Sequence, residues 1–98
     1  MSKLNKDNRK YPRFNVKWPV VIQNDDSIFK GEIRVMSANG GFIRSEQFLE
    51  PDKTIHLTIN IPESTPLELD AKVVSSAHSH PDDQRYPYSI SVQFEKGK

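Results

Sequence analysis

Residues 54–61, TIHLTINI, decide the fold class, because their side chains alternate strictly between apolar and polar. Successive side chains of a β-strand point to opposite faces, so this pattern predicts a strand with one face in a core and the other in water. The apolar positions are Ile55, Leu57, Ile59 and Ile61.

The same period of two recurs on both sides of this segment. Further strands are predicted at residues 16–22, 29–35, 41–45, 67–73 and 90–94. Parity places Val35 in the core beside Ile33, and Pro19, which lacks an N–H group, predicts an edge or a bulge. A single helical turn is predicted for Phe48 to Lys53. The whole pattern predicts an all-β protein, a six-stranded antiparallel β-barrel.

Turn signals separate the predicted strands. Asn24-Asp25-Asp26 predicts a turn, and Ser79 to Pro87 predicts a surface loop. Asn39-Gly40 favours a type I′ hairpin, which requires positive φ at both central residues. This hairpin would pair residues 41–45 with residues 33–36.

The composition limits the possible classes of protein. The 98 residues suit one domain, and the absence of cysteine excludes disulfides and cysteine-ligated zinc. The longest aliphatic run, Val20 to Ile22, is far shorter than the roughly 20 residues that span a bilayer, and the polar N-terminus does not resemble a signal peptide. We therefore expect a monomeric cytoplasmic domain without membrane insertion.

Charge is distributed unevenly along the chain. Residues 1–13 contain five basic residues and one acidic residue, whereas the remaining residues contain nine basic and twelve acidic ones. This predicts a flexible basic arm, 1–13, followed by a single barrel domain, 14–98. The net acidic body argues against DNA or RNA as a partner.

Two segments contain candidate binding residues. In Arg9-Lys10-Tyr11-Pro12-Arg13, proline disfavours a helix, so an extended arm would place two guanidinium groups on one side, up to about 13 Å apart. Guanidinium matches phosphate oxygens and the O6/N7 edge of guanine, although a frayed basic terminus explains the same residues. In residues 37–41, SANGG, glycine permits close backbone approach to a ligand, although a hairpin alone also explains this segment.

Histidine and carboxylate residues offer weaker candidates. No recognised motif places a nucleophile or carboxylate beside His56, so we expect no enzyme activity. His78 and His80 with Asp82 and Asp83 could bind a divalent ion, but a hydrated loop is the favoured interpretation. No metal site and no cofactor are predicted.

The two binding segments, in this order, resemble the PilZ domain family, bacterial receptors for cyclic di-GMP. The family pattern RxxxR corresponds to residues 9–13, and (D/N)xSxxG corresponds to residues 35–40, VMSANG. Residues 88–94, YSISVQF, resemble the last strand of the family. The resemblance implies a six-stranded barrel that binds cyclic di-GMP and interacts with a protein partner, which the sequence does not identify.

The resemblance also implies roles for individual residues. Arg9 and Arg13 would hold the phosphates and guanine faces, Ser37 would hydrogen-bond a guanine, and Gly40 would let the backbone lie against it. The arm would become ordered over the ligand. Further contacts are expected from the neighbouring residues Lys10, Arg34, Val35, Asn39 and Gly41.

Val35 departs from the family motif, which has an acidic or amide residue at this position. A lost charge-assisted hydrogen bond costs about 1.5–3 kcal/mol, or roughly 10- to 150-fold in affinity. Arg34 could replace it only if a bulge turned its side chain round. Two functions therefore stay open: a cyclic di-GMP receptor, or a degenerate PilZ domain acting as an adaptor in motility, pilus or exopolysaccharide systems.

Overall fold

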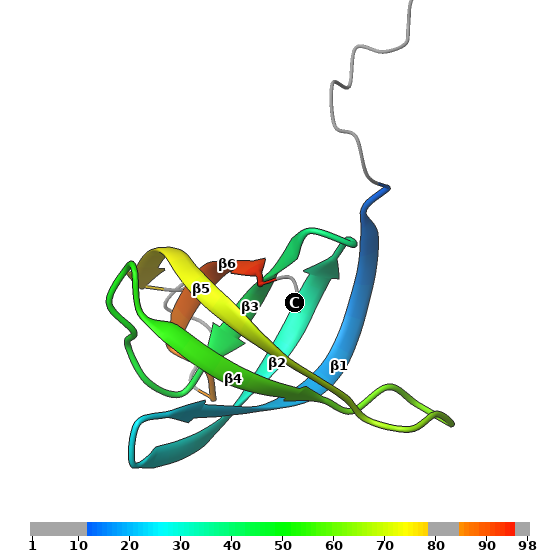
Figure 1. Ribbon diagram of the computed structural model, residues 1–98, viewed down its shortest axis with the longest axis horizontal. Helices are drawn as coiled ribbons and strands as arrows, with labels where there is room; N and C mark the ends of the chain where they lie inside the picture. Colours follow the sequence, from blue (N-terminus) through cyan, green and yellow to red (C-terminus); the bar gives the residue numbers. More distant parts are fainter. Residues whose placement is uncertain (1–11, 79–84, 96–98) are drawn as a thin grey trace, which may run out of the picture.

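Six antiparallel strands form a closed barrel in the computed structural model, which describes residues 12–78 and 85–95. The strand order around the barrel is β1-β2-β3-β6-β5-β4 (Figure 1). The described residues contain no helix, so the predicted fold class is confirmed. The strands are β1 (Phe14–Asn24), β2 (Ser27–Met36), β3 (Gly40–Ser45), β4 (Thr54–Ile59), β5 (Leu67–His78) and β6 (Tyr88–Phe94).

Alternate side chains fill the barrel with aliphatic residues. On β4 the predicted pattern is confirmed, since Ile55, Leu57 and Ile59 are buried, and Ile61 packs against the same core just beyond the strand. Val20, Ile33, Ile43, Val73 and Ile90 meet them from the other strands. Burial of each such side chain contributes about 1.5–3 kcal/mol, which makes this interior the main source of stability.

The segment between β3 and β4 is not the predicted helical turn. Its backbone forms a turn in which the N–H of Lys53 donates to the carbonyl of Glu50 at 3.4 Å, with Asp52 at φ 74°. The N–H of Asp52 and the carbonyl of Lys53 both bond to Val73 on β5. Backbone groups that bond to a neighbouring strand are not available for a helix. The segment instead lies against the barrel with Leu49 fully buried.

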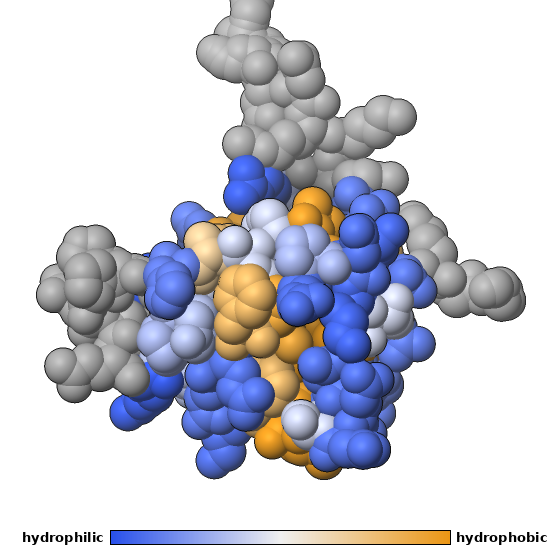
Figure 2. Space-filling view, turned by 90° about the vertical axis from the view of Figure 1, so that its left-hand side faces the viewer, coloured by the Kyte–Doolittle hydropathy of each residue, from blue (hydrophilic) through white to orange (hydrophobic). Residues whose placement is uncertain are grey.

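Apolar residues reach the surface at this side of the barrel. Figure 2 shows a band of hydrophobic residues between hydrophilic ones on the face at the left of Figure 1. Among the described residues, the exposed large apolar side chains are those of Phe14, Ile28, Phe48 and Val74. In the part of the chain described, no helix has the length and apolar character needed to cross a membrane.

A β-bulge in β2 changes which face Val35 occupies. Ile33 pairs with Ile43, but the next pair is Val35 with Phe42, so Arg34 is an extra residue in the strand. One extra residue reverses the alternation of a strand. Met36 therefore packs against the core, and Val35 lies on the outer face, so the prediction that Val35 is a core residue is wrong.

Pro19 lies at the limit of one strand pairing. Strand β1 pairs with β4 only from Val20 onward, so the missing N–H of Pro19 removes no bond between those two strands. Pro19 pairs with Glu32 of β2, and its carbonyl accepts the N–H of Asn60 at 2.9 Å. The prediction of an edge or a bulge at Pro19 is therefore wrong, because the barrel is closed and the irregularity in β1 lies upstream, between Asn15 and Trp18. The predicted turn between β1 and β2 is also confirmed, with Asp25 at φ 54°.

Candidate functional site

The turn between β2 and β3 is held by the hydroxyl of Ser37. Ser37 Oγ accepts the backbone N–H groups of Asn39 and Gly40 at 3.2 and 3.3 Å and donates to the carbonyl of Gly40 at 3.3 Å. The N–H of Ser37 donates to the same carbonyl at 2.9 Å. A serine hydroxyl has one donor and two acceptor positions, so these contacts use its full capacity.

The predicted hairpin is confirmed, but its predicted type I′ geometry is wrong. Neither Asn39 nor Gly40 has positive φ. Strand β3 instead begins at Gly40, after a three-residue connection whose conformation is set by the Ser37 side chain. Hydrogen bonding from a serine hydroxyl to the next backbone groups is an alternative way to form a turn.

Gly40 is required by the close approach of β6. A Cβ atom at this position would lie 2.2 Å from the carbonyl oxygen of Val92, a backbone atom that cannot move aside alone. At Gly41 a Cβ atom would lie 2.7 Å from the carbonyl oxygen of Val35. The two glycines therefore allow three strands to pack tightly at the end of the barrel.

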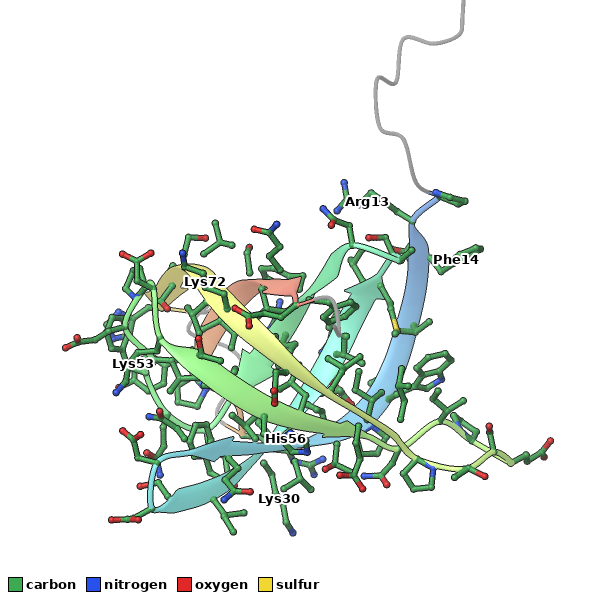
Figure 3. The ribbon with its side chains drawn as sticks, viewed as in Figure 1. Arg13, Phe14, Lys30, Lys53, His56 and Lys72 are labelled. Carbon is green, nitrogen blue, oxygen red and sulfur yellow. The ribbon has the colours of Figure 1, made fainter. Side chains whose placement is uncertain are left out.

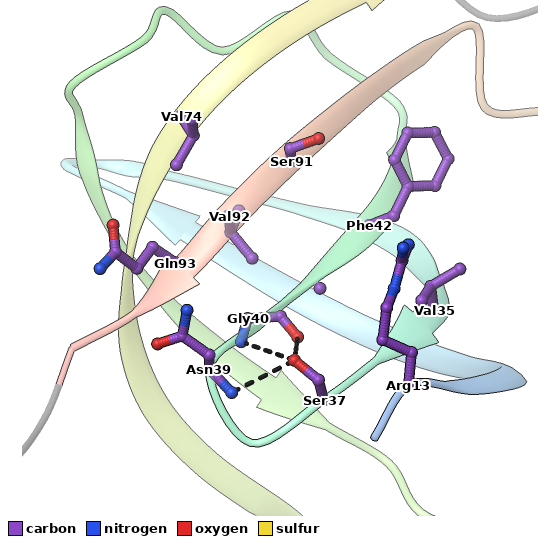
Figure 4. Close-up of a pocket in the computed structure, with 11 residues that line it drawn as sticks. Arg13, Val35, Ser37, Asn39, Gly40, Phe42, Val74, Ser91, Val92 and Gln93 are labelled. Carbon is purple, nitrogen blue, oxygen red and sulfur yellow. Dashed lines mark hydrogen bonds between the residues drawn. The ribbon is translucent and has the colours of Figure 1, made fainter. Parts of the chain in front are cut away.

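An open pocket of about 360 Å³ lies on the outer face of the barrel beside this turn (Figure 4). Ligand pockets commonly have volumes of roughly 300–1,000 Å³. The pocket combines one cation, several polar side chains and an apolar surface. Its lining residues are Arg13, Val35, Ser37, Asn39, Gly40, Gly41, Phe42, Val74, Ser91, Val92 and Gln93.

Three of the four main predicted site residues line this pocket. Arg13 stands at one rim, beside Val35 and Phe42 (Figure 4). Ser37 and Gly40 form the adjoining turn, together with the secondary candidates Asn39 and Gly41. Arg9 and Lys10 lie outside the described residues.

Arg34 is directed elsewhere. Although it is the bulged residue, it does not line the pocket. Its Nε donates to Glu32 Oε1 at 2.7 Å, within the same strand. The bulge therefore brings Val35, rather than Arg34, to the pocket.

Sequence reasoning missed five lining residues, one of which is the core residue Val92. Ser91 and Gln93 alternate with the core residues of β6, so their outward direction was predictable, but nothing in the sequence joined this face to the β2–β3 turn. Phe42 pairs directly with Ser91. Val74, 54% exposed, lies at a bulge in β5 that no local signal marks.

A second polar cluster lies on the outer face of β4 and β5. His56 Nδ1 is 2.9 Å from Asp70 Oδ1, and His56 Nε2 is 3.1 Å from Glu68 Oε1. These hydrogen bonds raise the pKa of His56 above its usual value because they stabilise the imidazolium, and the bond to Asp70 has the largest effect. His56 on β4 thus bonds to two carboxylates on β5.

Metal binding finds no support among residues 12–78 and 85–95, where no group of three histidine, cysteine or acidic residues has a geometry that could hold an ion. Of the predicted His/Asp cluster, His80, Asp82 and Asp83 lie outside the described residues. His78 instead stacks at an angle on Tyr88, with ring centroids 5.0 Å apart.

Several solved structures have a similar fold. The PilZ domain of YcgR from Escherichia coli, solved with cyclic di-GMP, superposes with a TM-score of 0.73 and 16% identity, covering 90% of this chain and 78% of that one. The Bacillus subtilis inhibitor of motility MotI (DgrA) gives a TM-score of 0.76 and 18% identity, with 92% of this chain and 44% of that one covered. The MrkH–cyclic di-GMP complex of K. pneumonia gives 0.70 and 20%, with coverages of 92% and 45%.

The chain thus spans less than half the length of two of these proteins. No curated protein sequence matches it significantly. The family model of the PilZ domain, however, matches residues 7–98, nearly the whole chain. Together with the closed six-stranded barrel, this match shows that the chain belongs to the PilZ domain family.

Proposed function

We propose that this domain is a receptor for cyclic di-GMP. One observation carries the proposal: Arg13 and the Ser37–Gly40 turn, which are separated in sequence, line the same pocket as the outer face of β6. The cation suits the phosphates of a cyclic dinucleotide, and the apolar surface of Phe42 and Val74 suits the faces of its bases. Two structural relatives were solved with this ligand.

The N-terminal arm completes the proposed site. Arg13 immediately precedes β1, so an extended arm would bring Arg9 within about 13 Å of it, and Lys10 closer still. Binding would order residues 1–13 over the ligand against the 14–98 barrel. A protein partner would then read the changed surface, and no catalytic step is involved.

Two features of the pocket favour a second candidate, an adaptor that has lost the nucleotide. Val35 brings a side chain without hydrogen-bonding capacity to the position of the motif's acidic or amide residue. The hydroxyl of Ser37 is fully used by the turn. Recognition of a guanine by Ser37 would therefore cost turn hydrogen bonds, which are worth about 1 kcal/mol each.

Calorimetric titration of the purified protein with cyclic di-GMP tests the receptor proposal. We expect saturable binding, and we expect Arg13→Ala to lower the affinity by about 100-fold or more, because both arms of the guanidinium fork are lost. Arg85→Ala is the matched control, since Arg85 is exposed and does not line the pocket. An absence of binding at high-micromolar nucleotide, with no ligand-dependent NMR shifts, would leave the adaptor as the function.

A further inference from the structure

Gln93 occupies a distinctive place in the pocket. It lies on the outer face of β6, at the opposite rim from Arg13 (Figure 4). Its partner across β3 is Gly40, which has no side chain, so nothing on that strand stands beside the amide. Its partner across β5 is Lys72, whose Nζ lies 3.8 Å from Asp52 Oδ1.

The hydrogen-bonding capacity of Gln93 is not used by the barrel. Its side chain forms no hydrogen bond with another residue of the described ranges. The motif position cannot contribute, since Val35 is apolar, and Ser37 is occupied by the turn. Ser91, half-buried beside Phe42, has only a hydroxyl and cannot form two parallel hydrogen bonds with a base edge.

We propose that Gln93 reads the hydrogen-bonding edge of a base in the bound cyclic dinucleotide, supplying from β6 an amide of the kind that position 35 lacks. This inference rests on the proposed receptor function. Guanine offers N1–H and N2–H donors beside the O6 acceptor. The carbonyl oxygen of Gln93 accepts from one of these donors while its NH₂ donates to O6.

The position of Gln93 has a consequence for the bound base. Gln93 lies two strands away from Val35 and two residues further along, so the two residues are separated by more than two strand spacings, or more than about 10 Å. A base read by Gln93 therefore lies over Gly40 toward β6 and Val74. The adjoining cavity of about 380 Å³, which Gln93 and Asn39 also line, leaves room on that side.

The chemistry of the amide makes the inference testable through base specificity. An amide can rotate to present either order of donor and acceptor, so glutamine also matches the N1 acceptor and N6 donor of adenine. A carboxylate only accepts, so it matches the two N–H donors of guanine but opposes the N1 atom of adenine. Gln93→Glu should therefore separate the two bases, while Gln93→Leu should weaken both.

The experiment titrates wild type, Gln93→Leu and Gln93→Glu with cyclic di-GMP and cyclic di-AMP. A bidentate contact is worth about 1–3 kcal/mol, so Gln93→Leu should weaken cyclic di-GMP binding about 5- to 150-fold. Gln93→Glu should keep cyclic di-GMP affinity within about tenfold and raise the preference over cyclic di-AMP by about tenfold. Gln23→Leu is the matched control, since Gln23 is exposed on β1 outside the pocket.

The outcomes separate this inference from the function on which it rests. If wild type does not bind cyclic di-GMP, the receptor proposal fails and Gln93 has no base to read. If wild type binds and both Gln93 variants match it within twofold, the receptor stands and the inference is wrong. Equal losses for both nucleotides in Gln93→Glu, or a loss that appears instead in Asn39→Leu, would also overturn it.

Discussion

Two polar groups on the outside of the barrel differ in how they are partnered. On β4 and β5, His56 bonds to Asp70 and Glu68 with both ring nitrogens. On β6, the side chains of Ser91 and Gln93 bond to no other described residue, and Arg13 stands at the facing rim of the same pocket. Figure 3 shows His56 and Arg13 in separate parts of the molecule.

The difference comes from the residues across each strand. His56 is directly opposite Asp70, with Glu68 two positions away on the same strand, so the cross-strand neighbours satisfy it. Gln93 is opposite Gly40, which offers no side chain. The hydrogen-bonding capacity of Gln93 is therefore unused within the described residues, whereas both ring nitrogens of His56 bond to carboxylates.

The largest expected effect on stability is that of a substitution at Gly40, which packs closely against β6 beside the pocket. Gly40→Ala places a methyl group against the carbonyl oxygen of Val92, so β3 and β6 must separate. We expect a loss of about 3 kcal/mol in the free energy of unfolding, which lowers the melting temperature by more than about 10 °C. Thermal unfolding followed by circular dichroism measures this, with Ala38→Val as the control at an exposed position of the same turn. An unchanged melting temperature would show that the strands need not approach so closely.

The second prediction concerns Val35, where a substitution can add a hydrogen-bond acceptor to the pocket. Val35→Asp restores the motif and should tighten cyclic di-GMP binding about 10- to 150-fold, because the carboxylate would accept hydrogen bonds from the ligand. The free energy of unfolding should change by less than about 1 kcal/mol, since the side chain is on the outer face. Titration calorimetry and urea unfolding measure the two quantities, and Val35→Asn provides an uncharged comparison. A loss of several kcal/mol would instead place residue 35 in the core.

The smallest expected effect is the pH-dependent contribution of His56 to stability. Because the pKa of His56 is raised in the folded state, its pairing stabilises the protein fully below the unfolded pKa of about 6.5, and this stability is lost as pH rises through the folded-state pKa. The side chain is 39% exposed, so solvent screening limits the gain to less than about 1 kcal/mol.

Comparing wild type with His56→Gln at about pH 5.5 and about pH 8.5 measures this gain. The stability difference should be larger at the lower pH. A difference that grows toward high pH would contradict the raised pKa.

The barrel was predictable from sequence because alternation is a local property. Residues 54–61 reveal their inward and outward faces without reference to any other strand. The same holds for β6, where Ile90 and Val92 alternate with polar residues. The resemblance to the PilZ family then predicted that Arg13 and Ser37 belong to one site, and both residues line the same pocket.

The remaining features depend on contacts between strands. The bulges at Arg34 and Val74 change the register with neighbouring strands, and neither residue type marks a bulge. The turn at Asn39-Gly40 was assigned the wrong geometry because its glycine satisfies a packing requirement from Val92 rather than a need for positive φ. Such requirements become visible only when the distant strand is in place.

The extra residue in β2 also makes the side chain at position 35 independent of the packing of the core. Because the bulge turns position 35 outward, replacing its side chain needs no rearrangement of the interior. A single substitution at position 35 can therefore add a hydrogen-bond acceptor to the pocket and leave a well-folded barrel. The integrity of the barrel therefore does not depend on which side chain position 35 presents to the pocket.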